Sequence, residues 1–192
     1  MAKVVVVYHS GYGHTAVIAK AVARGAESVA GSEVKLLRVE DVNGNFEPFA
    51  AADAIIFGCP TYMGSLSAPF KAFLDAASRE WMKQAWKDKL AAGFTNSGSP
   101  SGDKLSTLQS LCLNAMQHSM IWVSLGVMPP SNAGNEYQRP DQINRLGSFL
   151  GAMAQSNNAA PEQTPPSGDI ATGEHLGKRV AELAKRWVGA KA

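Results

Sequence analysis

The chain of 192 residues lacks the features that would point to an extracellular, metal-binding or membrane-spanning protein. Its two cysteines, Cys59 and Cys112, stand far apart and form no CxxC or zinc-ligand spacing, so we expect neither disulfides nor a metal site, and we expect a reducing compartment. No apolar run approaches the ~18 residues that a membrane helix needs, and the N-terminal apolar run is too short for a signal peptide. We therefore expect a cytoplasmic protein without membrane insertion.

The sequence also has little excess of positive over negative charge. The formal net charge is only +2, and no block of Lys or Arg is long enough to form a nucleic-acid stripe or a membrane patch. We therefore predict no nucleic-acid partner. With 45% hydrophobic and 18% charged residues, the composition suits one α/β domain over residues 1–192 with a sizeable core.

Near its start the sequence contains a run of β-branched residues that stops abruptly at small and hydroxyl residues. Residues 4–7 predict a strand, and a helical pattern begins after Thr15. A turn at this place brings free backbone N–H groups and the positive end of the helix dipole to one point, where an anion fits. Because the turn has no Lys or Arg, backbone amides and the hydroxyls of Ser10 and Thr15 would hold a phosphate, with Gly11 and Gly13 allowing its close approach.

Two other interpretations of this turn stay open at this point. It fits an ordinary βα turn with good capping residues. Residues 11–16 also fit the dinucleotide fingerprint G-x-G-x-x-[GA], and Glu40 or Asp41 stands near the end of the next strand, where a ribose-binding acid is expected. The Walker A pattern is absent, because no Gly-Lys-[Ser/Thr] follows.

Along the rest of the chain, strand patterns alternate with helical ones. We expect further strands at residues 32–39, 54–58, 90–94 and 120–125, and helices over residues 18–29, 70–77, 103–117 and 176–188. The segment 127–170 is rich in Pro, Gly, Ser, Asn and Gln; it predicts a long loop or insertion with one short extended piece at 148–152, serving as a lid or an oligomer contact. The alternation predicts a doubly wound, five-stranded parallel sheet with helices on both faces.

The first, third and fourth of these strands each end in a loop rich in Gly, Ser, Thr or Asn. In an open α/β sheet, ligands bind outside the carboxyl ends of the strands, where the strand order reverses. The order 2-1-3-4-5 places these three loops side by side, whereas a dinucleotide on the order 3-2-1-4 would use the loops after strands one, two and four. The sequence therefore favours a mononucleotide, and in the flavodoxin-like order that mononucleotide is FMN.

Short motifs over nearly the whole chain carry a resemblance to a known family. They are the opening residues 6–15, Gly-Cys-Pro-Thr-Tyr-Met-Gly at 58–64, Leu-Asp at 74–75 before Trp81, Gln-His-Ser-Met at 117–120 and Gly-Glu-His-Leu-Gly at 173–177. With these motifs the chain resembles the WrbA-type NAD(P)H:quinone oxidoreductases of the flavodoxin superfamily.

The resemblance implies a set of FMN-binding residues in three loops. The phosphate would be held by Ser10, Gly11, Tyr12, Gly13, His14 and Thr15. The isoalloxazine ring would be bordered by Pro60, Thr61, Tyr62, Met63 and Gly64. Its other side and the ribityl chain would be lined by Asn96, Ser97, Gly98, Ser99, Pro100 and Ser101.

The resemblance also implies catalytic roles for His118, Trp81 and Tyr12. The histidine would reach the pyrimidine end of the flavin, the tryptophan would face the substrate slot from a neighbouring subunit of a dimer or tetramer, and the tyrosine would lie near the nicotinamide donor. Read from the residues alone, His118 is equally an ordinary cap of the helix that ends at Gln117, Trp81 a core or subunit contact, and Cys59 an inert buried thiol.

The implied activity is that of an NAD(P)H dehydrogenase acting on quinones, with NADH or NADPH as co-substrate and ping-pong transfer of two electrons through FMN. A histidine or the amides of the third loop would stabilise the negative charge that develops near N1 and O2 of the flavin. Two alternatives stay open: a flavodoxin-type electron carrier, and an FMN-dependent azo or nitro reductase. Carriers are usually strongly acidic, and the net charge of +2 argues against that class.

Overall fold

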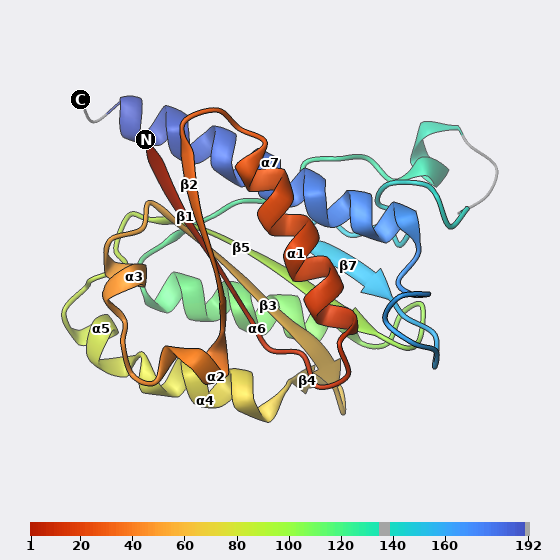
Figure 1. Cartoon of the computed structure of the whole chain (residues 1–192), viewed down its shortest axis with the longest axis horizontal. Helices are drawn as coiled ribbons and strands as arrows, with labels where there is room; N and C mark the ends of the chain where they lie inside the picture. Colours follow the sequence, from red (N-terminus) through yellow and green to blue (C-terminus); the bar gives the residue numbers. More distant parts are fainter. Residues whose placement is uncertain (135–138, 191–192) are drawn as a thin grey trace.

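Parallel strands form the centre of the computed structural model (Figure 1), which describes residues 1–134 and 139–190. The main strands run in the order β2-β1-β3-β5-β6, which confirms the predicted order 2-1-3-4-5. Their bounds are β1 Ala2–Tyr8, β2 Ser32–Arg38, β3 Ala54–Tyr62, β5 Leu90–Ser97 and β6 Ile121–Trp122. The predicted number of strands is wrong: β4 (Ser65–Leu66) pairs with β3 and β7 (Ala152–Gln155) with β5, so the described sheet has seven strands.

The predicted fifth strand is divided between β6 and β7. The first pairs with β5 at Leu90 and Ala91 only, and the second pairs with it from Phe94 to Ser97, so both lie on the same edge of β5. The strand predicted at 120–125 is therefore shorter than expected, and the extended piece predicted at 148–152 lies instead at 152–155. The reason is that the chain leaves the sheet after β6 and returns only at β7. Within the predicted segment 127–170, residues 135–138 lie outside the described part.

Helices cover both faces of the sheet, as the buried strands predict. Along β1, Val4 and Val6 face a core formed with α1 (His14–Glu27) and α7 (Ser167–Gly189), whereas Val5 and Val7 face a core formed with α4 (Ala68–Ala76) and α6 (Lys104–Gln117). This division follows from the two-residue period of a strand. The shorter helices are α2 (Val39–Val42), α3 (Glu47–Ala50), α5 (Ser78–Met82) and the 3-10 turn η1 (Pro130–Ala133). None of the described helices is long and apolar enough to cross a membrane.

Helices α1 and α7 lie side by side across one face of the sheet (Figure 1). Glycines allow their backbones to touch: a Cβ on Gly177 would stand 1.8 Å from the carbonyl oxygen of Val22, and one on Gly25 would stand 1.9 Å from that of Glu174. The last helix therefore fixes the position of α1, and with it the turn that precedes α1.

The pairing register aligns the ends of the strands. Tyr8 pairs with Gly58, Gly58 with Phe94, and Phe94 with Ala152. Because the four strands are parallel, the segments that follow these residues all emerge at one edge of the sheet.

Candidate functional site

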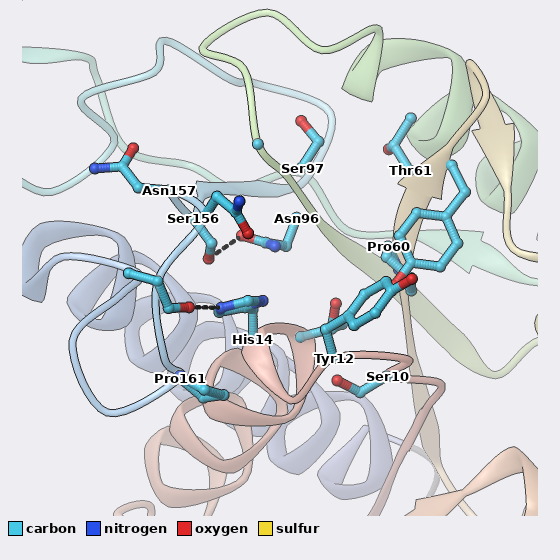
Figure 2. A pocket seen from close by; sticks show the side chains of 15 residues that line it. Ser10, Tyr12, His14, Pro60, Thr61, Asn96, Ser97, Ser156, Asn157 and Pro161 are labelled. Atoms are coloured by element: carbon cyan, nitrogen blue, oxygen red, sulfur yellow. Dashed lines mark hydrogen bonds between the residues drawn. The ribbon is translucent and has the colours of Figure 1, made fainter.

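A cavity of about 440 Å³ opens at the carboxyl edge of the sheet (Figure 2). Four segments line it: the turn after β1, the end of β3, the end of β5 and the loop after β7. Its lining residues are Ser10, Tyr12, His14, Thr15, Pro60, Thr61, Tyr62, Asn96, Ser97, Gly98, Ser156, Asn157, Asn158, Ala159 and Pro161. The volume lies within the range of small-molecule sites. The structure thus brings together the three predicted loops and adds a fourth.

The turn after β1 ends in Gly13, which is the N-cap of α1 and has φ 90. The N–H of Val17 donates to the carbonyl of Gly13, and the N–H of Ala16 donates to Oγ of Ser10 at 3.1 Å, which leaves the Ser10 hydroxyl hydrogen available to a ligand. The first turn of a helix carries N–H groups without intrahelical partners and a partial positive charge. Since none of the described lining residues is Lys or Arg, this end of the cavity suits an anion bound by amides and hydroxyls.

The loop after β7 closes the cavity over the start of α1. His14 Nε2 lies 2.8 Å from the carbonyl oxygen of Ala159, the contact drawn in Figure 2, and a Cβ on Gly13 would stand 2.6 Å from Cγ of Pro161. This loop lies within the predicted segment 127–170, but none of its residues is predicted from the sequence as a binding residue. The small polar run Ser156, Asn157 and Asn158 resembles the runs that end the other strands. It indicates a binding loop only if β7 is identified as the second half of the fifth strand.

Two tyrosines, Tyr12 (Figure 2) and Tyr62, form one wall of the cavity. The rings of Tyr12 and Tyr62 meet edge to face with centroids 6.2 Å apart, and Tyr12 is 77% exposed. A Cβ on Gly11 would stand 2.7 Å from the hydroxyl oxygen of Tyr62, so a larger residue there would push the Tyr62 ring aside. Burial raises the pKa of Tyr62, so its phenol is neutral at pH 7. Because the two rings are inclined by 69°, the pair forms an angled aromatic surface with a polar rim.

The end of β5 forms the opposite wall. Oγ of Ser156 donates to Oδ1 of Asn96 at 2.9 Å, and the N–H of Ser156 donates to the carbonyl of Ser97 at 3.0 Å, so the β5 and β7 segments support each other. Below them, Oγ1 of Thr61 lies 2.8 Å from that of Thr95 and 2.7 Å from that of Thr107. These hydrogen bonds join β3, β5 and α6 beneath the cavity.

Some predicted binding residues lie outside this cavity. Met63 and Gly64, at the tip between β3 and β4, are not among its lining residues, and the Met63 side chain is fully exposed. Pro100 and Ser101 line a neighbouring hollow instead, and the carbonyl of Ser99 points to the Lys104 ammonium. For a ligand in the cavity, the lining from β5 is thus Asn96, Ser97 and Gly98.

His118 lies far from the cavity of its own chain, and its predicted contact with a flavin stays a prediction. The residue caps the C-terminus of α6, before β6, and so lies at the amino end of the sheet, roughly 20 Å from the cavity along β5. It is 3% exposed, and its ring stacks on Trp86 with centroids 4.2 Å apart. Burial lowers the pKa of His118, which keeps the ring neutral at pH 7.

Trp81 lies on α5, also outside the cavity of its own chain, and is 40% exposed. An exposed position is compatible with the predicted contact to a neighbouring subunit, which stays a prediction. Cys59 is fully buried beside Ser67, and burial raises the pKa of its thiol to about 12. A thiol with that pKa is not a nucleophile at neutral pH.

Comparison with known proteins places this cavity in a family context. Residues 2–129 match the family model described as NADPH-dependent FMN reductase. The chain is 44% identical to Flavodoxin FldP of Pseudomonas aeruginosa, covering 97% of this chain and 98% of that protein. It is 35% identical to an NAD(P)H dehydrogenase (quinone) of Archaeoglobus fulgidus, covering 97% and 99%. A crystal structure of a WrbA-like flavodoxin protein from Agrobacterium tumefaciens superposes with a TM-score of 0.74 at 42% identity, covering 97% and 99%.

Proposed function

Because the chain belongs to the NADPH-dependent FMN reductase family and has a flavodoxin-like fold, we propose that it is an FMN-dependent NAD(P)H:quinone oxidoreductase. The relatives named NAD(P)H dehydrogenase (quinone) support the activity, since they are 30–35% identical over nearly the full chain. We include in the proposal that residues 1–192 act as one FMN-binding domain.

The observation that carries the proposal is the pairing of an anion cradle with an aromatic wall in one cavity. A terminal phosphate fits the turn at Gly13, where a side chain would collide with Pro161. A planar ring fits beside Tyr12 and Tyr62, between them and the polar groups of Asn96 and Ser97. The anion cradle, the polar groups and the aromatic wall match the three parts of FMN, which are one phosphate, a polar chain and a flat tricyclic ring.

Bound FMN would supply the redox chemistry by accepting a hydride from a nicotinamide and passing two electrons to a quinone. The chain would supply three things. Amides of the first turn of α1 and the Ser10 hydroxyl would hold the phosphate. The Tyr12 and Tyr62 rings would orient the planar part, and polar groups at the end of β5 would face the charge that develops on reduction.

The second candidate is a flavodoxin-type electron carrier, which the name of the relative Flavodoxin FldP favours. Electron carriers of this type dock on partner proteins through charge, and the net charge of +2 does not supply a strong acidic field. Reduction of the bound flavin by NADH or NADPH alone, without a partner protein, separates the oxidoreductase from the carrier. An azo or nitro reductase differs only in the acceptor.

We expect FMN to bind tightly and FAD to bind roughly 100-fold more weakly, a difference of ~2.7 kcal/mol. The reason is that the phosphate end of the cavity is closed: Pro161 lies over Gly13, and His14 holds the loop at Ala159, so an adenylate cannot continue past the phosphate. Quenching of flavin fluorescence during titration with each cofactor measures both affinities. Equal affinities would favour the dinucleotide interpretation of the turn.

The cavity is the one candidate flavin site among the described residues, so donor and acceptor would visit it in turn, and we expect ping-pong kinetics. If Trp81 of a neighbouring copy forms a wall of the substrate slot, Trp81→Ala should raise KM for benzoquinone by about tenfold, ~1.4 kcal/mol, and leave FMN affinity unchanged. Trp81→Phe, which keeps an aromatic ring, should retain most of the wild-type KM. Intersecting initial-rate lines would contradict the shared slot, and an unchanged KM would contradict the role of Trp81.

A further inference from the structure

A fully buried lysine lies directly behind the β5 wall of the cavity. Lys104, the first residue of α6, is 0% exposed, and its ammonium donates to Oγ of Ser97 at 2.9 Å, to the carbonyl of Ser99 at 2.7 Å and to the carbonyl of Pro100 at 2.9 Å. An ammonium group has three N–H donors, and each of the three finds an acceptor in this one loop. Three oxygen atoms of this loop therefore surround the Lys104 ammonium.

The backbone is shaped to bring these three oxygen atoms together. Gly102 and Asp103 have φ 54 and φ 53, which turns the chain back so that α6 starts directly beneath the loop. A Cβ on Gly102 would stand 2.0 Å from Oγ of Ser97, so glycine permits the closure. Because Ser97 both lines the cavity and accepts from Lys104, a single side chain separates the ammonium from the ligand space.

Two further charged residues complete the cluster, the half-buried Arg145 and the buried Asp169. Arg145 binds Asp169 of α7 through two hydrogen bonds of 2.7 and 2.9 Å, and the carboxylate also accepts the N–H of Gln155 at 2.8 Å. The amide of Gln155 in turn donates to the carbonyl of Gly98 at 3.2 Å. The arginine and aspartate cancel each other, so Lys104 leaves one net positive charge behind the cavity wall.

Lys104 is still charged at neutral pH. Burial lowers its pKa to about 8, while the nearby Asp169 carboxylate opposes that shift and Arg145 adds to it. At pH 7 the ammonium form therefore predominates. A charge in such a poorly solvated place is weakly screened and acts over a longer distance than a surface charge.

We propose that Lys104 is a positioning residue for the flavin: it fixes the loop at Ser97–Pro100 against the cofactor, and its buried charge favours reduced FMN over oxidised FMN. The inference rests on the proposed function and adds to it a group that tunes the cofactor. Reduction places negative charge on the ring, and a positive charge behind the wall stabilises that state more than the neutral one. Lys104 lies beside the cavity of its own chain, whereas His118 of the same chain lies at the opposite end of the sheet.

Lys104→Met keeps the length of the side chain and removes the charge. We expect the Kd of reduced FMN to rise about tenfold more than that of oxidised FMN, which corresponds to a fall of about 30 mV in the two-electron midpoint potential of the bound flavin. The matched control is Lys89→Met. Lys89 likewise donates to two backbone carbonyls, those of Ala50 and Ala52, but at the amino end of the sheet, and its replacement should leave the ratio of the two Kd values unchanged.

A second measurement does not depend on a variant that folds. By linkage, reduced FMN must raise the pKa of Lys104 in the wild-type protein more than oxidised FMN does, and NMR of the lysine side chain in the two loaded states measures this. Equal pKa values in the two states, or a Lys104→Met variant that weakens both redox forms equally, would overturn the electrostatic role and leave the proposed function intact. A wild-type protein that binds no FMN would overturn both.

Discussion

A Gly13→Val variant is expected to lose FMN binding, with Kd raised by at least about 100-fold, or ~2.7 kcal/mol. Gly13 has φ 90, a conformation that β-branched residues resist, and any Cβ there would stand 2.6 Å from Cγ of Pro161. Valine would therefore open the loop after β7 and shift the first turn of α1. Both changes move the amides that the phosphate needs.

The matched control for this variant is Gly44→Val. Gly44 also has a positive φ, of 77, but a Cβ there meets nothing within 4 Å. The two variants share the backbone strain of ~1–3 kcal/mol and differ in whether the strain falls at the cavity. Titration with FMN, alongside circular dichroism to check folding, should show wild-type affinity for Gly44→Val only. A folded Gly13→Val protein that binds FMN normally would mean that the phosphate is held elsewhere.

The strands and the first turn could be predicted because their signals are local. Consecutive β-branched residues in β1 and β3, followed by glycine and hydroxyl residues, define where a buried strand stops. The parallel order then requires these stops to share one edge, and the register at Tyr8, Gly58 and Phe94 confirms it. The meeting of these loops at one edge could thus be predicted from the sequence.

The loop after β7 could not be predicted, because the strand that positions it is short and weak. Residues 152–155, Ala-Met-Ala-Gln, have little β-branched character, and they become a strand only because β5 offers an open edge. Tertiary pairing therefore decides that β7 forms, and the polar run that follows it indicates a binding loop only once β7 is known.

The burial of Lys104 and the position of His118 relative to the cavity could not be predicted from the sequence, for a common reason. Helical periodicity predicts a helix over residues 103–117, but it does not say that the two ends of this helix lie at opposite edges of the sheet. α6 runs antiparallel to β5, so its first residue lies by the cavity and its cap lies by Trp86. A lysine within an apolar helix pattern also reads as solvent-exposed, because lysine is rarely buried without partners.

The second large effect concerns the helix that holds the cradle in place. Gly177→Ala is expected to destabilise the protein by about 3 kcal/mol or more, since the added Cβ would stand 1.8 Å from the carbonyl oxygen of Val22 and 3.0 Å from the N of Ala26. These are backbone atoms of α1, which cannot rotate away as a side chain would. The two helices must separate, and the loss is a large part of a total stability of about 5–15 kcal/mol.

Gly189→Ala, in the same helix α7, is the matched control, because a Cβ there meets nothing within 4 Å. Alanine has the higher helix propensity, so this variant should be neutral or up to about 1 kcal/mol more stable. Urea unfolding followed by circular dichroism compares the two. Separation of α1 from α7 also displaces the turn at Gly13, so the part of the Gly177→Ala protein that stays folded should bind FMN more weakly. Equal urea midpoints for both variants would mean that α1 is not held by this contact, and the position of the phosphate cradle would then have to be fixed by β1 and the loop over Gly13 alone.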